Sequence, residues 1–311
     1  MDIKQKASLF AISSAFVLAG SKFSVGLLSG SMAVASSGLD SLLDVFMSAM
    51  NFLAITKAAQ PPDLTHPYGH GKTESLAAVG QSFVILFTGS FIIFKAAEKY
   101  FLKEGVAYSV LDLGVMVLSL LFSFIISTTL RKVGRKTDSD ALKADALHYT
   151  SDLYSNSAAI LAILLTYYTG QVSFDMLFAV IVGLIIIFSA LKILKSGVVG
   201  LMDSRIPEAI EASLITIITD RPFPVAGYHN LRTRFSGTRK YADFHSLICR
   251  KLNVTEAHEE ANKMEAEIKS KIQSIDIVIH IEPCSFDCEL TEATCNVLKQ
   301  KGGESHRHKL R

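Results

Sequence analysis

Long uncharged stretches run through the chain and stop near residue 203. Residues 75–94 and 153–174 contain no charged side chain, and each is long enough for a helix to cross the roughly 30 Å hydrocarbon layer of a membrane. Residues 113–130 and 176–191 are shorter uncharged runs, which reach spanning length once flanking side chains extend to the interface. These four stretches predict four membrane-spanning helices.

The first sixty residues predict two more spans. Their uncharged runs are residues 7–21, 23–39 and 45–56, interrupted only by Lys22, Asp40 and Asp44. A signal peptide is the alternative for residues 1–20, because Lys4 and Lys6 precede an uncharged run. However, no small-residue cleavage site leads into a hydrophilic start, and the next apolar segment needs a partner span. We therefore expect six spans in total.

Basic residues in the short loops predict the orientation. Short cytoplasmic loops carry the excess of Lys and Arg, and six spans place on one side Lys4, Lys6, Arg131, Lys132, Arg135, Lys136, Lys192 and Lys195. The opposite side is poor in net charge. We expect a multi-pass protein of the cytoplasmic (inner) membrane, with residues 1–203 as its transmembrane domain and both termini in the cytoplasm.

Frequent charges after residue 203 indicate a soluble domain, residues 204–283. The pattern predicts a helix, two strands, a second helix and a third strand, at Pro207–Asp220, His229–Gly237, Tyr241–Lys251, 255–274 and Asp276–Pro283. Gly237 marks a hairpin turn, and Asn253 or Thr255 caps the second helix. The order αββαβ predicts an α+β fold with the helices on one face of a small sheet.

Composition supports a membrane protein and excludes a nucleic-acid binder. Half of the 311 residues are hydrophobic and 19% are charged, whereas soluble domains carry about 25% charged residues. The formal net charge is only +2. A nucleic-acid-binding module would need a basic patch.

Two pairs of polar residues lie inside predicted spans at the same spacing. Asp40 and Asp44 are four residues apart, as are His148 and Asp152, so each pair lies on one helix face, one turn apart. Ionisable groups within a membrane are costly and usually functional. Three carboxylates and one imidazole suit Zn²⁺, which accepts both ligand types. The alternative is buried ion pairs or helix caps, above all for Asp140, Asp145 and Asp152.

The loop after the second span contains a third candidate group. Asp63, His66 and His70 could form a three-ligand metal site at the cytoplasmic surface, with a position open for water or exchange. The alternative is that these histidines are simply solvated.

These motifs together resemble the cation diffusion facilitator family, in its bacterial YiiP/FieF-type branch of divalent metal efflux proteins. The resemblance covers residues 1–283 and rests on DxxxD, HPYGHGKxE and HxxxD. It implies a homodimer with six transmembrane helices and a ferredoxin-like cytoplasmic domain, which exports divalent metal in exchange for protons. The implied transport site is Asp40, Asp44, His148 and Asp152. His148 favours zinc, since manganese-type members carry a carboxylate or Asn there.

The resemblance also implies a charge interlock between Lys72 and Asp203 at the dimer contact, and a binuclear cytoplasmic metal site. The ligands of that site would be His229, His245, His258, His280 and Glu282. Close relatives have Asp where this chain has Glu282, and the longer carboxylate can still bridge two metals. The positions of the histidines, at a strand start, within a strand, in a helix and near a strand end, agree with convergence across a small sheet.

The remaining chain, residues 284–311, has no clear periodicity and is predicted to be a flexible tail. It contains Cys284, Cys288, Cys295, His306 and His308. Reduced cytosolic thiols are one interpretation, because disulfides rarely persist in the cytosol. An accessory soft-metal site is the other.

The sequence therefore predicts a secondary active transporter, not an enzyme, with Zn²⁺ as the favoured substrate and as a regulatory or structural ion. Fe²⁺, Cd²⁺ and Co²⁺ tolerate the same mixed ligands. An intramembrane metallohydrolase is a rival, but no HExxH motif is present, and four protein ligands leave no coordination position open for water. A membrane metal sensor or scaffold that does not transport is the second rival. Flux measurements in proteoliposomes separate a transporter from a sensor, and a peptide-cleavage assay tests for a metallohydrolase.

Overall fold

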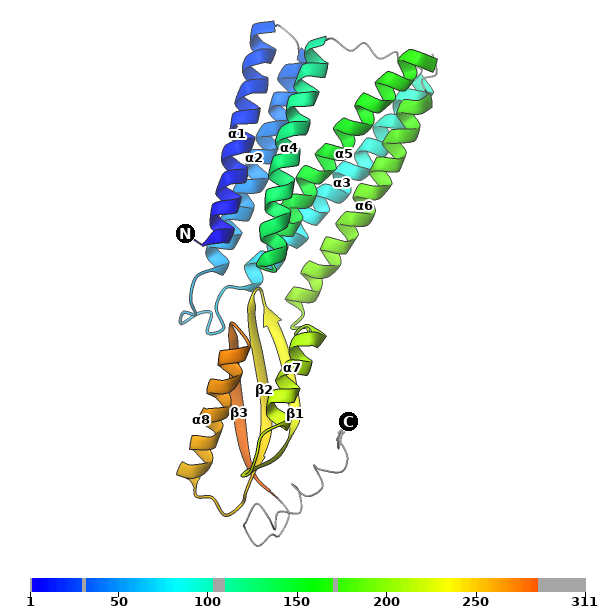
Figure 1. Ribbon diagram of the computed structural model, residues 1–311. Coiled ribbons are helices and arrows are strands. Elements are labelled where there is room, and N and C mark those ends of the chain that lie inside the picture. The colour runs from blue at the N-terminus through cyan, green and yellow to red at the C-terminus, as the bar shows by residue number, and fades with distance from the viewer. Residues whose placement is uncertain (1, 30–31, 103–109, 170–172, 285–311) are drawn as a thin grey trace. The chain divides into compact units, whose positions relative to one another are not determined.

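The computed structural model describes residues 2–29, 32–102, 110–169 and 173–284. The chain divides into two compact units, Met1–Met202 and Asp203–Arg311. The first unit consists of six long helices (Figure 1), which are α1 (Ile3–Ser29), α2 (Met32–Ala58), α3 (Lys72–Leu102), α4 (Val110–Lys136), α5 (Asp140–Thr169) and α6 (Ser173–Leu201). The prediction of six helices in this part of the chain is confirmed.

Five of the six helices contain a stretch that is long and apolar enough, among the described residues, to cross a membrane. These are α1, α2, α3, α4 and α6. Helix α5 is as long as the others, with 30 residues, but its first half carries Asp140, Lys143, Asp145, His148 and Asp152. Helix α5, the least apolar of the six among the described residues, therefore carries two of the four predicted transport ligands, His148 and Asp152.

Two apolar clusters divide the helical unit. One joins α1, α2, α4 and α5 through Ala11, Ile55, Leu130 and Tyr149, and we call these helices the four-helix body. The other centres on α3 and α6. These two helices approach closely at Gly183, where an added Cβ would lie 2.5 Å from Cγ1 of Ile93. The absence of a side chain at this position thus sets the spacing of the α3–α6 pair.

The second unit contains α7 (Glu208–Thr219), β1 (Val225–Ser236), β2 (Arg239–Ile248), α8 (Val254–Lys271) and β3 (Ile275–Pro283). The sheet order is β1-β2-β3, with β1 antiparallel and β3 parallel to β2. Both helices pack their apolar residues on one face of this sheet, in a cluster that includes Leu214, Ile218, Phe244, Met264 and Ile277. The predicted αββαβ order is confirmed.

Local features of this unit agree with the sequence pattern in most places. Asn253 and Glu256 form a reciprocal capping box at the start of α8, as one of the two expected caps, and Gly237 takes a positive φ of 58° in the hairpin turn. Strand β1 starts at Val225, four residues earlier than predicted. Cys284, the first residue of the predicted tail, is buried, and its backbone N–H donates to the carbonyl of Ile248 at 2.8 Å. The other four tail residues singled out, Cys288, Cys295, His306 and His308, lie outside the described residues.

Candidate metal sites

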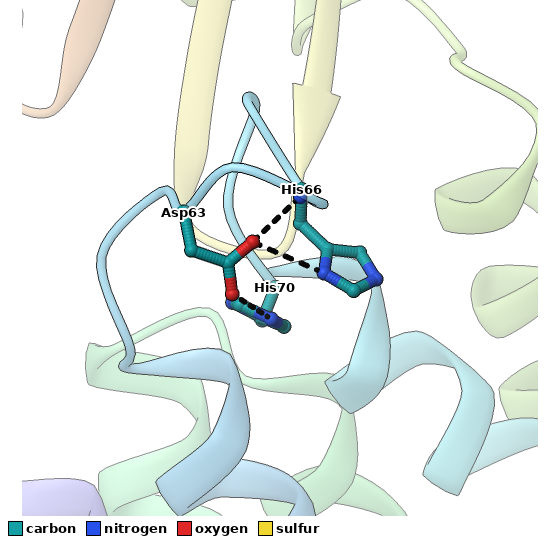
Figure 2. A group of neighbouring side chains, drawn as sticks. All are labelled: Asp63, His66 and His70. Carbon is teal, nitrogen blue, oxygen red and sulfur yellow. Dashed lines mark hydrogen bonds and ion pairs between the residues drawn. The ribbon is translucent and has the colours of Figure 1, made fainter.

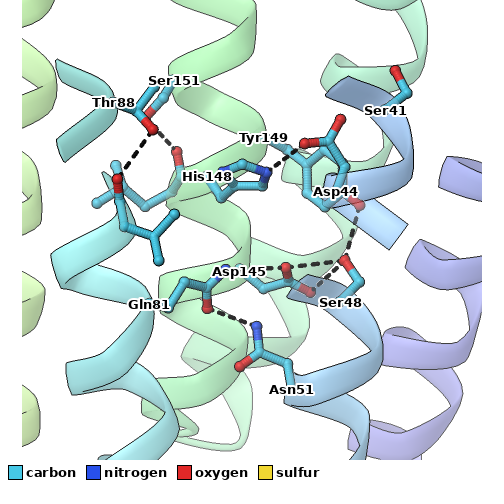
Figure 3. Close-up of polar contacts among 12 residues, drawn as sticks. Ser41, Asp44, Ser48, Asn51, Gln81, Thr88, Asp145, His148, Tyr149 and Ser151 are labelled. Atoms are coloured by element: carbon cyan, nitrogen blue, oxygen red, sulfur yellow. Dashed lines mark hydrogen bonds and ion pairs between the residues drawn. The ribbon is translucent and has the colours of Figure 1, made fainter. Parts of the chain in front are cut away.

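Among the described residues, three groups of ligand-type side chains have donor atoms within 4.8 Å of one another. The first lies between helices. Asp44 of α2 faces His148 of α5 (Figure 3), with 2.9 Å between Oδ1 of Asp44 and Nε2 of His148, and Asp152 completes the group. Both partners are largely shielded, with side-chain exposures of 20% and 12%. The group thus offers one nitrogen and two carboxylates within the helical unit.

The fourth predicted ligand of this group is Asp40. Its backbone lies in α2, one turn before Asp44, and its side chain lies outside what the structure describes. The neighbouring Ser41 is fully described, and its hydroxyl oxygen accepts a hydrogen bond of 2.8 Å from Nζ of Lys22 in α1. Lys22 and Ser41 are both buried, so an ammonium group lies beside the stretch of α2 that carries the two acidic residues.

The suggestion that nearby acidic residues are helix caps is wrong for Asp145 and Asp152. Both lie inside α5, which begins at Asp140, and Asp145 accepts hydrogen bonds from side chains of other helices. Ser139 is the residue just before the helix, and its Oγ lies 3.4 Å from the backbone nitrogen of Leu142. Asp140 instead accepts from Oγ of Ser196 at 3.2 Å. The capping role therefore belongs to Ser139.

The second group, Asp63, His66 and His70, lies in the loop between α2 and α3 (Figure 2). One carboxylate oxygen of Asp63 holds the loop together, because it accepts from the backbone nitrogens of Thr65 and His66 and from the hydroxyl of Thr65. The other oxygen points toward His70, whose Nε2 lies 3.4 Å away. The hydroxyl of Thr65 contributes most to lowering the pKa of Asp63 to about 2, so this exposed carboxyl is ionised at neutral pH.

The ring of His70 is buried in this loop without hydrogen bonds among the described atoms. The residue is only 7% exposed, yet both of its ring nitrogens are buried without a hydrogen-bond partner among the described atoms. Buried polar groups normally have partners. A metal ion held by His70, His66 and the Asp63 oxygen that faces His70 would give one of these nitrogens a ligand bond.

The third group lies on the sheet of the second unit. His229, His245 and His280 stand at matching register positions on the three strands, with ring centroids 4.9 and 4.7 Å apart along the row. Glu282 joins two of them, with Oε2 2.8 Å from Nε2 of His229 and Oε1 2.7 Å from Nδ1 of His245. These two hydrogen bonds lower the pKa of Glu282. Glu282 thus ties the histidines of β1 and β2 together through its two oxygens, and a carboxylate of this kind is able to bridge two metal ions.

His280 and His258 relate to this group differently. Nε2 of His280 lies 3.7 Å from Oε1 of Glu282, at the edge of the group. His258 is exposed on α8, a helix that packs Met264 and Ile268 on the apolar face of the sheet. Since Ile277 of that face alternates with His280 along β3, the histidine row lies on the opposite face. One protomer therefore does not bring His258 to the other predicted ligands.

The two residues of the expected charge interlock are each described within their own unit. Nζ of Lys72 donates to the carbonyl oxygen of Leu201 at 3.1 Å. Asp203 accepts a 2.9 Å hydrogen bond from Nη1 of Arg234 and takes a positive φ of 51°.

Sequence reasoning missed a buried ion pair near the start of α3. Lys4 of α1 and the hydroxyl of Ser139 both donate to the carboxylate of Glu74. Lys4 and Glu74 are 7% and 2% exposed. In the sequence, Lys4 contributes only to the prediction of membrane orientation, as one of the basic residues on the cytoplasmic side. The position of Glu74 directly after the His-rich loop was the available signal.

The arrangement of helices and metal-ligand groups is that of a membrane protein that handles metal cations, and the sequence comparisons agree. Residues 8–202 match the cation efflux transmembrane domain, and residues 206–284 match the cytoplasmic domain of cation efflux proteins. The chain belongs to the cation efflux family, in the YiiP/FieF-type branch of cation diffusion facilitators.

Several curated relatives are cation-efflux pumps called FieF. The protein of Salmonella choleraesuis (strain SC-B67) is 35% identical over 280 residues, which cover 90% of this chain and 93% of the relative. The protein of Salmonella newport (strain SL254) is 36% identical over 256 residues, covering 82% and 85% of the two chains. The similarity thus extends over both units.

Proposed function

We propose that this protein exports divalent metal cations, zinc above others, across the inner membrane in exchange for protons. The observation that carries the proposal is the pairing of Asp44 with His148, together with Asp152, between helices of the membrane unit. Asp40, one turn from Asp44, supplies the fourth ligand. A site of one imidazole and three carboxylates, without thiolate, suits a borderline metal that must also be released.

Proton exchange follows from the same ligands. Carboxylates and a neutral imidazole must be deprotonated to hold metal, so protons and metal compete for them. In the proposed cycle, the site loads metal from the cytoplasm, turns outward and releases it as protons bind. Fe²⁺, Cd²⁺ and Co²⁺ are further candidate substrates because they accept the same donors. Both termini lie in the cytoplasm in this proposal.

The other two groups are proposed as sites for resident metal ions. The buried ring nitrogens of His70, which make no hydrogen bond among the described atoms, support a metal in the Asp63, His66 and His70 loop. The hydrogen bonds that Glu282 accepts from two histidines support a metal on the sheet. In a homodimer, α8 of the second protomer would add its His258 to these ligands. Metal there would neutralise Glu282, draw two protomers together and bias the membrane unit, with Lys72 and Asp203 as the charge interlock.

Zinc uptake into proteoliposomes under an imposed proton gradient tests the proposal. We expect uptake that depends on the gradient, and at least a tenfold loss in Asp44→Ala and His148→Ala. Asp138→Asn is the matched control. It removes an exposed carboxylate, two residues before α5, that pairs only with Lys143 among the described residues, and Asn tolerates the positive φ of 50° at this position. Absence of flux in the natural protein, with zinc still bound, would favour a metal sensor. Wild-type rates in both site variants would refute the site.

A further inference from the structure

A buried polar network lies one helical turn from the proposed transport site (Figure 3). Ser48 follows Asp44 by one turn on α2, and its hydroxyl donates to the two carboxylate oxygens of Asp145 at 3.1 and 3.3 Å. The same oxygen of Ser48 lies 2.9 Å from the hydroxyl of Tyr149. Because Ser48 has one proton and gives it to the carboxylate, Tyr149 donates to Ser48. Two hydroxyls thus connect α2 and α5 beside His148.

A second arm of the network reaches α3. Nε2 of Gln81 donates to Oδ1 of Asp145 at 3.3 Å, and Nδ2 of Asn51 donates to Oε1 of Gln81 at 2.6 Å. We call these five residues, Ser48, Asn51, Gln81, Asp145 and Tyr149, the polar clamp. The clamp joins the four-helix body to α3, whereas the apolar cluster of that body includes, among the described residues, none from α3.

The polar clamp is sealed from solvent, which makes its hydrogen bonds obligatory. Asp145 and Ser48 are 0% exposed, and the other three residues are 1 to 3% exposed. A buried donor or acceptor that loses its partner keeps the full cost of desolvation, because water does not replace the bond. A sliding movement of α2 along α5 by one residue would therefore leave Asp145 and Ser48 unpaired.

The polar clamp continues the ladder of the transport site. Asp44 pairs with His148, and four residues further along α2 Ser48 pairs with Asp145, three residues back along α5. The helices are therefore antiparallel, and the two pairs are successive rungs. The Ser48–Asp145 pair, which contains no proposed metal ligand, therefore fixes the register of the two helices at the Asp44–His148 pair.

Resting on the proposed transport function, we infer that Asp145 is a positioning residue that sets which size of cation the transport site accepts. Through Ser48 and Gln81 it holds α2 and α3 against α5, and so limits how far Asp44 can move from His148. Zinc bonds to carboxylate oxygen and imidazole nitrogen measure about 2.0–2.2 Å. Cd²⁺ has the same filled d shell and a larger radius. A loosened site would therefore lose more affinity for zinc than for cadmium.

Zinc and cadmium transport by clamp variants tests this inference. In Ser48→Ala and Asp145→Asn proteoliposomes, we expect the ratio of zinc to cadmium transport efficiency to fall at least fivefold, mainly through a higher KM for zinc. Ser48→Thr keeps the hydroxyl and should restore the ratio. Ser82→Ala is the matched control, because it removes an equally buried hydroxyl that bonds only its own helix at Ala78 among the described contacts.

An equal loss for both metals, or an unchanged ratio, would overturn the inference, since a merely structural role lowers both rates alike. Should Asp145→Asn fail to fold, Ser48→Ala decides by itself. Failure of the proposed function gives a different result, namely no gradient-driven zinc flux in the natural protein. In that case, equilibrium binding of zinc and cadmium to the same two variants tests the clamp. The affinity ratio is taken only for the binding that His148→Ala abolishes.

Discussion

Nε2 of His148 lies 2.9 Å from Oδ1 of Asp44, although 104 residues separate them in the chain. The contact is a direct hydrogen-bonded ion pair between two helices of the membrane unit, and it brings an imidazole and a carboxylate together. The nitrogen donor is the chemical feature that separates this group from an all-oxygen site.

Replacing that nitrogen donor should change the preferred metal. In His148→Asp the proposed site would consist of four carboxylates, and oxygen ligands favour harder ions such as Mn²⁺ over zinc. We expect zinc transport to fall at least tenfold and Mn²⁺ transport to rise, measured as competition between the two metals in proteoliposomes. Asn262→Asp, which adds a carboxylate at an exposed position of α8 outside the proposed sites, is the control. An unaltered preference in His148→Asp would argue against direct metal contact by this residue.

The ion pair of Lys4 with Glu74 should be sensitive to loss of one partner. Both side chains are buried, and removing one member of a buried pair leaves an uncompensated charge that costs about 3–5 kcal/mol. Lys4→Met should therefore lower the thermal unfolding temperature clearly. In Lys4→Met/Glu74→Gln both charges are gone, and most of the loss should be recovered.

An exposed pair provides the comparison. Lys95 and Glu98 lie one turn apart on α3 with side chains 56% and 39% exposed, and such surface pairs contribute about 0–1 kcal/mol. Lys95→Met should leave the unfolding temperature nearly unchanged. A double variant at Lys4 and Glu74 that is as unstable as the sum of the two single variants would contradict the ion-pair explanation.

A side chain at Gly183 should disturb the contact of α3 with α6. An added Cβ would lie 2.5 Å from Cγ1 of Ile93 and 3.0 Å from the carbonyl oxygen of Gly89. Overpacking of this kind costs about 1–3 kcal/mol, so Gly183→Ala should unfold at lower temperature. Gly183 lies on α6, whereas Gly80 lies on α3, and an added Cβ at Gly80 meets no atom within 4 Å. Gly80→Ala should gain up to about 1 kcal/mol from helix propensity. Equal effects at both glycines would refute the close approach.

Glu282 should make the stability of the second unit depend on pH. Hydrogen bonds from His229 and His245 lower its folded-state pKa below the ordinary value of 4.5. The ionised carboxylate therefore stabilises the fold at pH above about 4.5, and this contribution is lost as pH falls through the lower folded-state value. In metal-free, full-length protein, Glu282→Gln should be less stable than the natural protein at pH 6.

The difference between the natural protein and Glu282→Gln should disappear toward pH 3, as followed by thermal melts monitored by circular dichroism. Glu265→Gln is the control, because it changes an exposed helical glutamate that pairs with Lys269 on the same helix. A stability difference that stays constant from pH 6 to pH 3 would show that ionisation of Glu282 plays no part.

The sequence pattern predicts those parts of the structure that depend on local periodicity. Uncharged runs indicate the six helices, and a spacing of four places His148 and Asp152 on one face of α5. The position of Asp145 near the predicted helix start indicates a cap, and this prediction is wrong because its partners Ser48 and Gln81 come from α2 and α3. Nothing local to a residue encodes which distant helix will face it.

Strand register was equally inaccessible from the sequence. The histidines at 229, 245 and 280 are expected from the sequence to converge across a small sheet. Their alignment in one row, however, depends on antiparallel pairing on one side of β2 and parallel pairing on the other. The ion pair of Lys4 with Glu74 joins residues 70 positions apart. Such relationships arise from packing of whole elements.

Because side chains alternate between the two faces along β3, the cluster on the sheet depends on the exact number of residues within this strand. His280 and Glu282 share one face of the strand, while Ile275 and Ile277 occupy the other and fill the core. Insertion or deletion of one residue between Ile277 and His280 would turn both ligands toward the helices in a single event. We therefore expect homologues that keep this cluster to vary here by substitution, or by two residues at a time, and never by one.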